Sequence, residues 1–288
     1  MKSVSLFKPP WLNKKINLNS KYIEFKRLLR KYNVHTVCEE SRCPNISECF
    51  SKKHLTFLIL GTRCTRNCLF CNIEQNKNIP LDEEEPWRVA KMVEELSLNY
   101  VIITSVTRDD LPDGGAEIFS RTIQLVKKKN PFCKVEVLIP DFGGNFNSLD
   151  KVISASPDIV AHNIETSPRL YPYIRPSSDY NRSVNVLKYV KKIRKDIFTK
   201  SGMILGLGEF PQEVIDVMRN LRSVGCDFLS LGQYLAPSSK HWKVQRFIPP
   251  EEFDFYKRVG LDLGFKYVVS GPYVRSSYIE EGFLKCFG

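Results

Sequence analysis

The sequence predicts an α/β fold in which a partial (β/α)6 barrel of the TIM type carries an N-terminal and a C-terminal extension. From residue 55 onward, short runs rich in Val, Ile and Leu alternate with amphipathic stretches of helical period. The runs show little alternation of polar and apolar residues, which is typical of parallel strands covered on both faces. Six or so successive βα units indicate a full or partial barrel. A doubly wound open sheet is the alternative.

The predicted elements follow one another in regular order. The strands are predicted at 55–60, 100–105, 134–139, 158–163, 199–205 and 227–233, with a seventh short run at 266–270. The helices are predicted at 86–98, 116–129, 147–155, 180–195, 211–224 and 251–263. We therefore divide the chain into an N-terminal extension at 1–50, a barrel at 51–270 and a C-terminal extension at 271–288. The first extension contains one helical pattern, at 21–32, followed by a loop with three cysteines.

The bulk composition restricts the classes of function. A chain of 288 residues with 42% hydrophobic residues can form one large domain with its own core. Its net charge of +11 favours acidic partners, but no basic run is long enough for a nucleic-acid arm, so we expect no nucleic-acid partner. No apolar run approaches the roughly 18 residues of a membrane span, and the start of the chain has no apolar signal core. We expect a cytoplasmic protein with no membrane partner.

The cysteines carry the strongest signal. Six of the nine lie between residues 38 and 71, and clustered thiols in a cytoplasmic chain indicate metal ligands before disulfides. Cys64, Cys68 and Cys71 form a CxxxCxxC pattern four residues after the first strand, at the barrel face where active sites are built. Three thiolates can hold three irons of a [4Fe–4S] cluster and leave the fourth iron open. A zinc site or three ordinary buried cysteines are the alternatives, and zinc prefers four ligands in paired spacing.

A second cysteine triplet precedes the first. Cys38, Cys43 and Cys49 are spaced CxxxxCxxxxxC, a pattern that alone would be weak. It ends fifteen residues before Cys64, and two triplets of different spacing suggest two clusters with different tasks.

Beyond the cysteines, the sequence resembles the lipoyl synthase family of radical S-adenosylmethionine enzymes. The resemblance rests on five further motifs: TSVTRDDLPDGGA at 104–116, HNIET at 162–166, GMILGLGE at 202–209, QYLAP at 233–237 and GPYVRSSY at 271–278. Together with the cysteines they span residues 38 to 278. The sequence departs from the family at Ala236, where a polar residue is common.

Three of these motifs suggest contacts with the cofactor. Asp113, Gly114 and Gly115 follow a strand, and glycines let the backbone approach a ligand such as the cofactor's ammonium group closely; an ordinary turn is the alternative. Asn163 and Glu165 lie two apart at a strand end, so both can face the barrel mouth, where a carboxylate suits ribose hydroxyls. The glycines at 202, 206 and 208 are expected to leave room for adenine.

The C-terminal motif suggests a ligand for the second cluster. The resemblance implies that a serine oxygen of this motif binds the auxiliary cluster, and we favour Ser277 over Ser276, although the residues themselves do not separate the two. An alkoxide is a harder ligand for iron than a thiolate, which suits a cluster that is taken apart. The alternative is a serine-rich turn capped by Arg275.

The resemblance also implies the reaction. The cluster on Cys64, Cys68 and Cys71 would cleave S-adenosylmethionine to a radical that abstracts hydrogen from carbons 6 and 8 of a protein-bound octanoyl chain. The auxiliary cluster, held by Cys38, Cys43, Cys49 and Ser277, would supply both sulfur atoms and be consumed.

The implied partners are an octanoylated lipoyl carrier domain or H-protein as substrate, a reductant and a cluster-repair protein, with the enzyme itself a monomer. Lys240 and Arg246, after the sixth strand, are candidates for meeting the acidic carrier. Two other functions remain as alternatives. One is a methylthiotransferase acting on RNA, and the other is an iron–sulfur or zinc scaffold or electron carrier.

Overall fold

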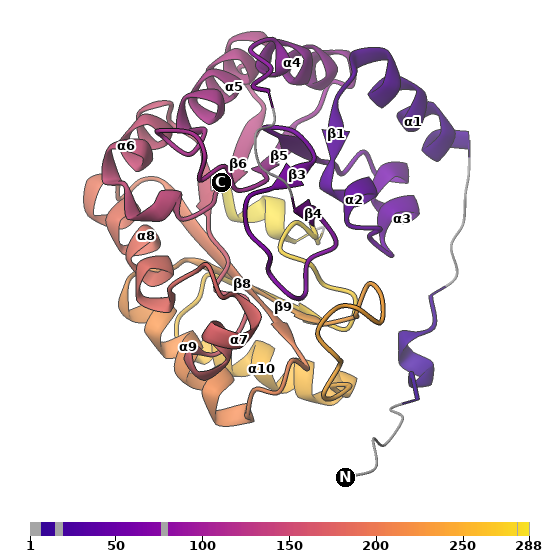
Figure 1. The fold of residues 1–288 in the computed structure, drawn as a ribbon, viewed down its shortest axis with the longest axis vertical. Coiled ribbons are helices and arrows are strands. Elements are labelled where there is room, and N and C mark those ends of the chain that lie inside the picture. Colours follow the sequence, from indigo (N-terminus) through magenta and orange to yellow (C-terminus); the bar gives the residue numbers. More distant parts are fainter. Residues whose placement is uncertain (1–6, 15–19, 76–79, 281, 288) are drawn as a thin grey trace.

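A curved sheet of eight strands forms the centre of the computed structural model, which describes residues 7–14, 20–75, 80–280 and 282–287. The strand order is β1-β2-β5-β6-β7-β8-β9-β10 (Figure 1). From β2 to β10 all neighbours pair in parallel, whereas β1 pairs antiparallel with β2 at the edge. The bounds are His35–Thr36 for β1, Thr56–Ile59 for β2, Tyr100–Ser105 for β5, Lys134–Leu138 for β6, Ile159–Ala161 for β7, Phe198–Leu205 for β8, Phe228–Gln233 for β9 and Tyr267–Gly271 for β10.

Helices follow the strands and form an outer ring around the sheet (Figure 1). They are α4 (Glu85–Glu95), α5 (Ala116–Lys129), α6 (Phe146–Ser154), α8 (Tyr180–Ile193), α9 (Pro211–Ser223) and α10 (Pro250–Asp262). Side-chain caps fix where two of them begin: Asn145 accepts from the second and third backbone N–H groups of α6, and Asp179 accepts from the N–H of Arg182 in α8. The predicted partial α/β barrel is therefore confirmed.

The residues before β2 pack against the barrel. Here lie α1 (Ser20–Tyr32), α2 (Val37–Glu40), α3 (Ile46–Ser51) and the short 3-10 helix η1 (Pro10–Leu12). Phe25 and Leu29 of α1 are buried with Phe50 of α3, in the same hydrophobic core as residues of α4 and α5. This extension thus shares its core with the barrel, and the division of the chain at residues 50 and 270 stays a prediction.

The C-terminal residues close the barrel at the amino ends of its strands. Phe283, in the 3-10 helix η4 (Phe283–Phe287), packs edge-on against Tyr100 and Phe228, which begin β5 and β9. Beside them Lys200 and Glu136 form an ion pair of 2.9 Å whose side chains are 3% and 1% exposed. Access to the barrel interior is thereby directed to the opposite, carboxyl-terminal face of the sheet.

The predicted elements match the observed ones within one or two residues at most ends. Three short α-helices were not predicted: α2, α3 and α7 (Tyr171–Ile174), which are too short for a periodic pattern. The edge strand β1 and the paired strands β3 (Arg63–Cys64) and β4 (Glu74–Gln75) were also not predicted. Within the described residues, no helix combines the length and the apolar character that crossing a membrane requires.

Candidate active site

A cavity of about 580 Å³ opens at the carboxyl ends of the barrel strands. Its wall includes residues 104–107 at the end of β5, 138–140 at the end of β6, 202–204 in β8 and 232–237 at the end of β9, together with parts of both extensions. The volume lies within the range of sites that hold small molecules or cofactors. The cavity is therefore at the face where the sequence predicted the active site.

The first cysteine triplet lies on one side of this cavity. Cys64, Cys68 and Cys71 all line it, Cys64 at the end of β3 and the other two in the loop between β3 and β4. Backbone N–H groups of Arg66 and Thr107 donate to the Cys64 sulfur at 3.4 and 3.3 Å. Burial raises the pKa of the Cys71 thiol to about 12, and the neighbouring Cys68 and Cys64 add to that rise. Burial also raises the pKa of the Cys68 thiol, and a bound cation favours the thiolate forms of Cys68 and Cys71.

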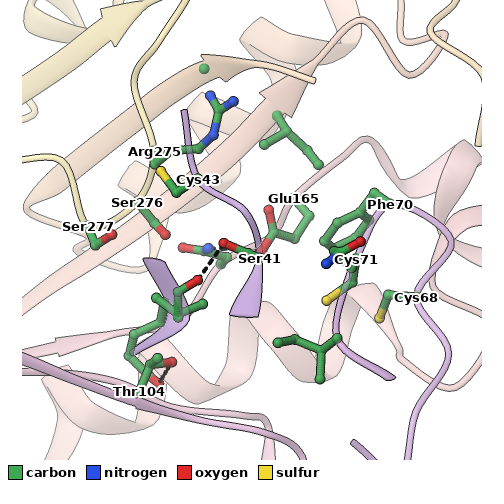
Figure 2. Close-up of a pocket in the computed structure, with 18 of the residues that line it drawn as sticks. Ser41, Cys43, Cys68, Phe70, Cys71, Thr104, Glu165, Arg275, Ser276 and Ser277 are labelled. Carbon is green, nitrogen blue, oxygen red and sulfur yellow. Dashed lines mark hydrogen bonds between the residues drawn. The ribbon is translucent and has the colours of Figure 1, made fainter. Parts of the chain in front are cut away.

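The second triplet lies on the other side. Cys38 and Cys43 line the same cavity. Burial raises the pKa of the Cys38 thiol to about 12, with further contributions from the nearby Cys43 and Cys49. Figure 2 shows Cys43 near Arg275, Ser276 and Ser277 at one end of the cavity, and Cys68 and Cys71 at the other, with Glu165 between. Residues of the second cysteine triplet and of the C-terminal motif thus meet at one end of the cavity, and residues of the first triplet lie at the other.

The donor sets fit iron–sulfur clusters. All nine cysteines are free thiols. In the part of the chain that is described, no three His, Cys, Asp or Glu side chains converge closely enough to hold a single metal ion. In a [4Fe–4S] cluster each cysteine thiolate binds a different iron, so three thiols gathered in one region are a suitable donor set.

The end of β7 supplies hydrogen-bond acceptors to the cavity. The Asn163 amide donates to a Glu165 carboxylate oxygen at 2.9 Å, while its own carbonyl oxygen is buried and has no partner among the described residues. The His162 Nδ1 lies 2.8 Å from the carbonyl oxygen of Ile139, so Nδ1 carries the proton and the buried, unpartnered Nε2 is an acceptor. Burial lowers the pKa of His162 to about 4, which keeps the ring neutral. Such a set suits a ligand that brings hydroxyl or ammonium donors.

Arg175 was not predicted as a site residue. It lines the cavity, and its guanidinium donates to the backbone oxygens of Asn163 and Ile164 and to the Tyr171 hydroxyl at 2.8–3.3 Å. It also opposes the rise in the Cys68 pKa that burial causes. No pattern marks Arg175 in the sequence, because only the fold places it beside the acceptor group.

Arg66 was missed as well, although it lies inside the first cysteine motif. Its guanidinium donates to both carboxylate oxygens of Asp109 and to Asp141, each at 2.7 Å. Asp141 also accepts from Arg182 at 2.8 Å. These ion pairs join the cysteine loop to the loops after β5 and β6 and to α8.

The glycine-rich residues after β5 lie outside the cavity lining. Asp113 accepts from the backbone N–H groups of Gly115 and Glu117 and so holds the start of α5, and it pairs with Lys151 at 3.0 Å. A Cβ atom at Gly115 would lie 2.2 Å from the Leu60 side chain, and one at Gly114 would lie 2.9 Å from Phe142. The two glycines therefore let neighbouring side chains pack closely against the backbone, where the sequence predicted the close approach of a cofactor. This loop reaches the cavity through residues 104–107 instead.

Two further predictions are also modified. Of the glycines expected to make room for adenine, Gly202 lines the cavity, whereas Gly206 and Gly208 pack against residues 245–246. Arg246, a candidate for carrier docking, has its guanidinium engaged by the carboxylate of Glu252.

Comparison with known proteins is consistent with this geometry. The family profile described as "Radical SAM superfamily" matches residues 58–221, and one described as "N-terminal domain of lipoyl synthase of Radical_SAM family" matches residues 2–43. The chain is 53% identical to the lipoyl synthase of Caldicellulosiruptor saccharolyticus, over 95% of this chain and 96% of the relative. It is 55% identical to the lipoyl synthase of Aquifex aeolicus, over 90% and 94%.

Solved structures resemble the fold at much lower identity. A methylornithine synthase matches with a TM-score of 0.52 at 18% identity, over 75% of this chain and 71% of that one. The [FeFe]-hydrogenase maturase HydG matches with a TM-score of 0.59 at 16% identity, over 74% of this chain and 50% of that one.

Proposed function

The chain belongs to the lipoyl synthase family of radical S-adenosylmethionine enzymes, and on that premise we propose which of its residues perform each part of the reaction. The enzyme inserts two sulfur atoms, at carbons 6 and 8 of a protein-bound octanoyl chain. Its cofactors are two [4Fe–4S] clusters and S-adenosylmethionine, which supply the radical chemistry and the sulfur when bound. The protein's own residues bind and orient these groups.

Cys64, Cys68 and Cys71 hold the cluster that binds S-adenosylmethionine. Their shared cavity wall and the raised pKa of Cys71, to which Cys68 and Cys64 contribute, support this assignment. The backbone N–H groups of Arg66 and Thr107 that donate to the Cys64 sulfur hold this side chain at the cavity wall.

Asn163 and Glu165 bind the nucleoside part of S-adenosylmethionine, and His162 assists them. The support is the buried, unpartnered Oδ1 of Asn163 and Nε2 of His162, because leaving such acceptors unpaired is unfavourable unless a ligand satisfies them. Arg175 holds the backbone of this group in place. The contacts of Asp113, Gly114 and Gly115 are with α5 and its neighbours, so we assign them no direct cofactor contact.

Cys38, Cys43, Cys49 and Ser277 hold the auxiliary cluster, which is a sulfur-donating substrate of the reaction. Support comes from the proximity of the three thiols and from the serines on the same cavity wall. Ser277 and Ser276 occupy the two central positions of one turn, closed by the Tyr278 N–H donating to the Arg275 oxygen at 2.9 Å. Ser277 is our assignment, from the resemblance, and Ser276 is the alternative.

The octanoyl chain occupies the apolar part of the cavity, between the two sets of cysteines. Val37, Phe70, Ile73, Val106 and Leu235 line it. An apolar wall excludes water from a reactive radical and favours a hydrocarbon chain.

The acyl group arrives on an octanoylated lipoyl carrier domain or H-protein. The net charge of +11 supports recognition of an acidic carrier, and Lys240, in the loop after β9, is the candidate contact that remains after Arg246 is found paired with Glu252. A reductant and a cluster-repair protein complete the set of partners, and we propose that the enzyme acts as a monomer. Nine free thiols suit a reducing compartment such as the cytoplasm.

One observation carries this proposal: thiols of both triplets line one cavity, and Cys43 lies at the opposite end from Cys68 and Cys71 (Figure 2). The test is the content of iron and acid-labile sulfide after anaerobic reconstitution. Wild type is compared with two triple Cys→Ala variants, one for each triplet. Each variant should retain about half the iron of wild type. If removal of Cys38, Cys43 and Cys49 leaves the iron content unchanged, the auxiliary cluster and the sulfur-donor assignment are both lost.

A further inference from the structure

Three stretches that are distant in sequence meet beside the auxiliary cysteines. These are residues 12–14 near the amino terminus, the segment 38–49 that carries the second cysteine triplet, and residues 273–278 after β10. We call 38–49 the auxiliary cysteine loop and 275–278 the serine turn. Two side chains of the auxiliary cysteine loop, Asn45 and Glu48, each form hydrogen bonds to both of the other stretches.

Asn45 contacts the other two stretches at once. It is 1% exposed and lies between Cys43 and Cys49 in the chain. Its amide nitrogen donates to the backbone oxygen of Tyr273 at 2.6 Å, and its carbonyl oxygen accepts from the Lys14 Nζ at 2.5 Å. A buried amide with both of its groups paired fixes the distance between the segments that it joins.

Glu48 makes the corresponding contacts one helical turn later. Its Oε1 accepts from the Tyr278 hydroxyl at 3.2 Å, and its Oε2 pairs with Lys14 at 2.8 Å. Lys14 therefore bridges Asn45 and Glu48, and its Nζ also lies 5.0 Å from the centre of the Tyr273 ring. Tyr273 in turn donates through its hydroxyl to the backbone oxygen of Leu12.

These contacts lie on either side of the serines. Tyr273 precedes Ser276 and Ser277, and Tyr278 follows them directly. A Cβ atom at Gly232 would lie 1.9 Å from the Val274 oxygen, so the same segment is also pressed closely against β9. The serine turn is thus held at both ends by protein contacts, independently of any contact of its own hydroxyl groups.

We propose that Asn45 and Glu48 are positioning residues that hold the serine turn over the auxiliary cysteines, with Lys14 bracing both. The inference rests on the proposed role of a serine in this turn as a cluster ligand. A weak oxygen ligand that is tethered on both sides stays close to its iron, because the tether raises its effective concentration there. Loosening the tether should therefore make the auxiliary cluster more labile without removing any of its ligands.

The test measures iron release in a full-length background that lacks Cys64, Cys68 and Cys71, so that only auxiliary-cluster iron is counted. The reconstituted protein is mixed anaerobically with a ferrous-iron chelator, and the rate of colour formation is recorded. Asn45→Asp, which removes the donor to Tyr273 but keeps an acceptor for Lys14, should release iron roughly three- to tenfold faster. Tyr278→Phe, which removes only a hydroxyl, should do the same. Lys52→Gln is the matched control, because Lys52 contacts the same Glu48 oxygen at 3.2 Å without touching the serine turn.

A double variant separates positioning from general destabilisation. If Glu48→Ala acts through Tyr278, adding Tyr278→Phe to it should not accelerate iron release further. The thermal midpoint of each cluster-free variant reports any loss of the fold itself.

The double variant Ser276→Ala/Ser277→Ala tests the serine ligand itself. If this double variant accelerates iron release but Asn45→Asp and Tyr278→Phe do not, the positioning role is overturned while the serine ligand stands. If the double serine variant releases iron at the wild-type rate, the proposed serine ligand fails instead. Equal acceleration by Lys52→Gln would also overturn the inference, since the effect would then come from surface charge.

Discussion

The Arg66 guanidinium, within the first cysteine motif, donates from Nη2 to the carboxylate of Asp141 at 2.7 Å, and the Asp141 side chain is fully buried. Although burial opposes ionisation, the bonds from Arg66 hold the pKa of Asp141 well below its usual range. The pair fixes the loop that carries Cys68 and Cys71 to the loop after β6. The orientation of the cluster ligands therefore depends on a residue that does not itself touch the cavity.

The first prediction concerns this pair. Asp141→Asn leaves the guanidiniums of Arg66 and Arg182 without their shared anion, and breaking a buried pair by removing one partner costs about 3–5 kcal/mol. Denaturant unfolding of the cluster-free protein measures the loss. Asp109→Asn is the control, because Asp109 binds the same Arg66 but is 42% exposed, so its removal should cost about 1 kcal/mol. Equal losses for the two variants would contradict the role given to burial.

The second prediction is a pH dependence of stability. The Glu85 carboxylate accepts from the backbone N–H of Leu60 at 2.6 Å, where the chain leaves β2 in a left-handed conformation with φ of 68°. Burial raises the pKa of Glu85 from 4.5 to about 7, although the Leu60 N–H opposes the rise. The folded state therefore binds its proton more tightly than the unfolded state.

The direction of this pH dependence follows from the linkage between proton binding and folding. The stabilisation due to the protonated Glu85 is complete below pH 4.5 and is lost as the pH rises to about 7. Relative to Glu85→Gln, the free energy of unfolding of wild type should fall by roughly 3 kcal/mol between pH 5 and pH 8. Parallel pH profiles for the two proteins would show that Glu85 is not responsible.

The third prediction uses two glycines that differ in their surroundings. A Cβ atom at Gly232 would lie 1.9 Å from the backbone oxygen of Val274, whereas one at Gly271 would meet only a Val274 methyl group at 3.5 Å. Gly232→Ala should displace the segment that leads into the serine turn and lower octanoyl conversion at least tenfold, while Gly271→Ala should change it little. Activity and auxiliary-cluster iron are measured in both. Similar activities for the two variants would mean that this close approach is not required.

The fourth prediction concerns the unpaired acceptor in the cavity. Asn163→Leu removes the buried Oδ1 that we assign to the nucleoside and should weaken binding of S-adenosylmethionine to the reconstituted enzyme roughly tenfold. Equilibrium dialysis measures the dissociation constant, and Asn185→Leu, on the exposed side of α8, serves as the control. An unchanged constant for Asn163→Leu would remove Asn163 from the proposed binding site.

Most of the fold could be predicted because each strand and each long helix has a recognisable pattern within its own stretch of sequence. The apolar runs at 100–105 and 227–233 and the amphipathic stretch at 116–129 agree closely with β5, β9 and α5. The shorter α7 gives no such signal. The cysteine triplets were found because their spacing is itself a local pattern, and the structure brings each of them together.

The rest of the site depends on contacts between distant residues. Arg175 and Asp141 act through partners that only the folded barrel supplies, and no spacing in the sequence indicates them. Conversely, the pattern Asp113-Gly114-Gly115 is equally typical of a ligand-binding turn and of the start of a helix. The choice between them is made by Leu60 and Phe142, which fill the space beside the glycines.

The central claim is that the two ends of one cavity have different tasks, and one experiment tests it most directly. The triple variant of Cys38, Cys43 and Cys49 to Ala is reconstituted and mixed with reductant, S-adenosylmethionine and an octanoylated carrier. Both 5′-deoxyadenosine and sulfur-containing product are then quantified. We expect 5′-deoxyadenosine still to form while no sulfur enters the octanoyl chain. Sulfur insertion by this variant, or loss of 5′-deoxyadenosine formation with the other cluster intact, would contradict it.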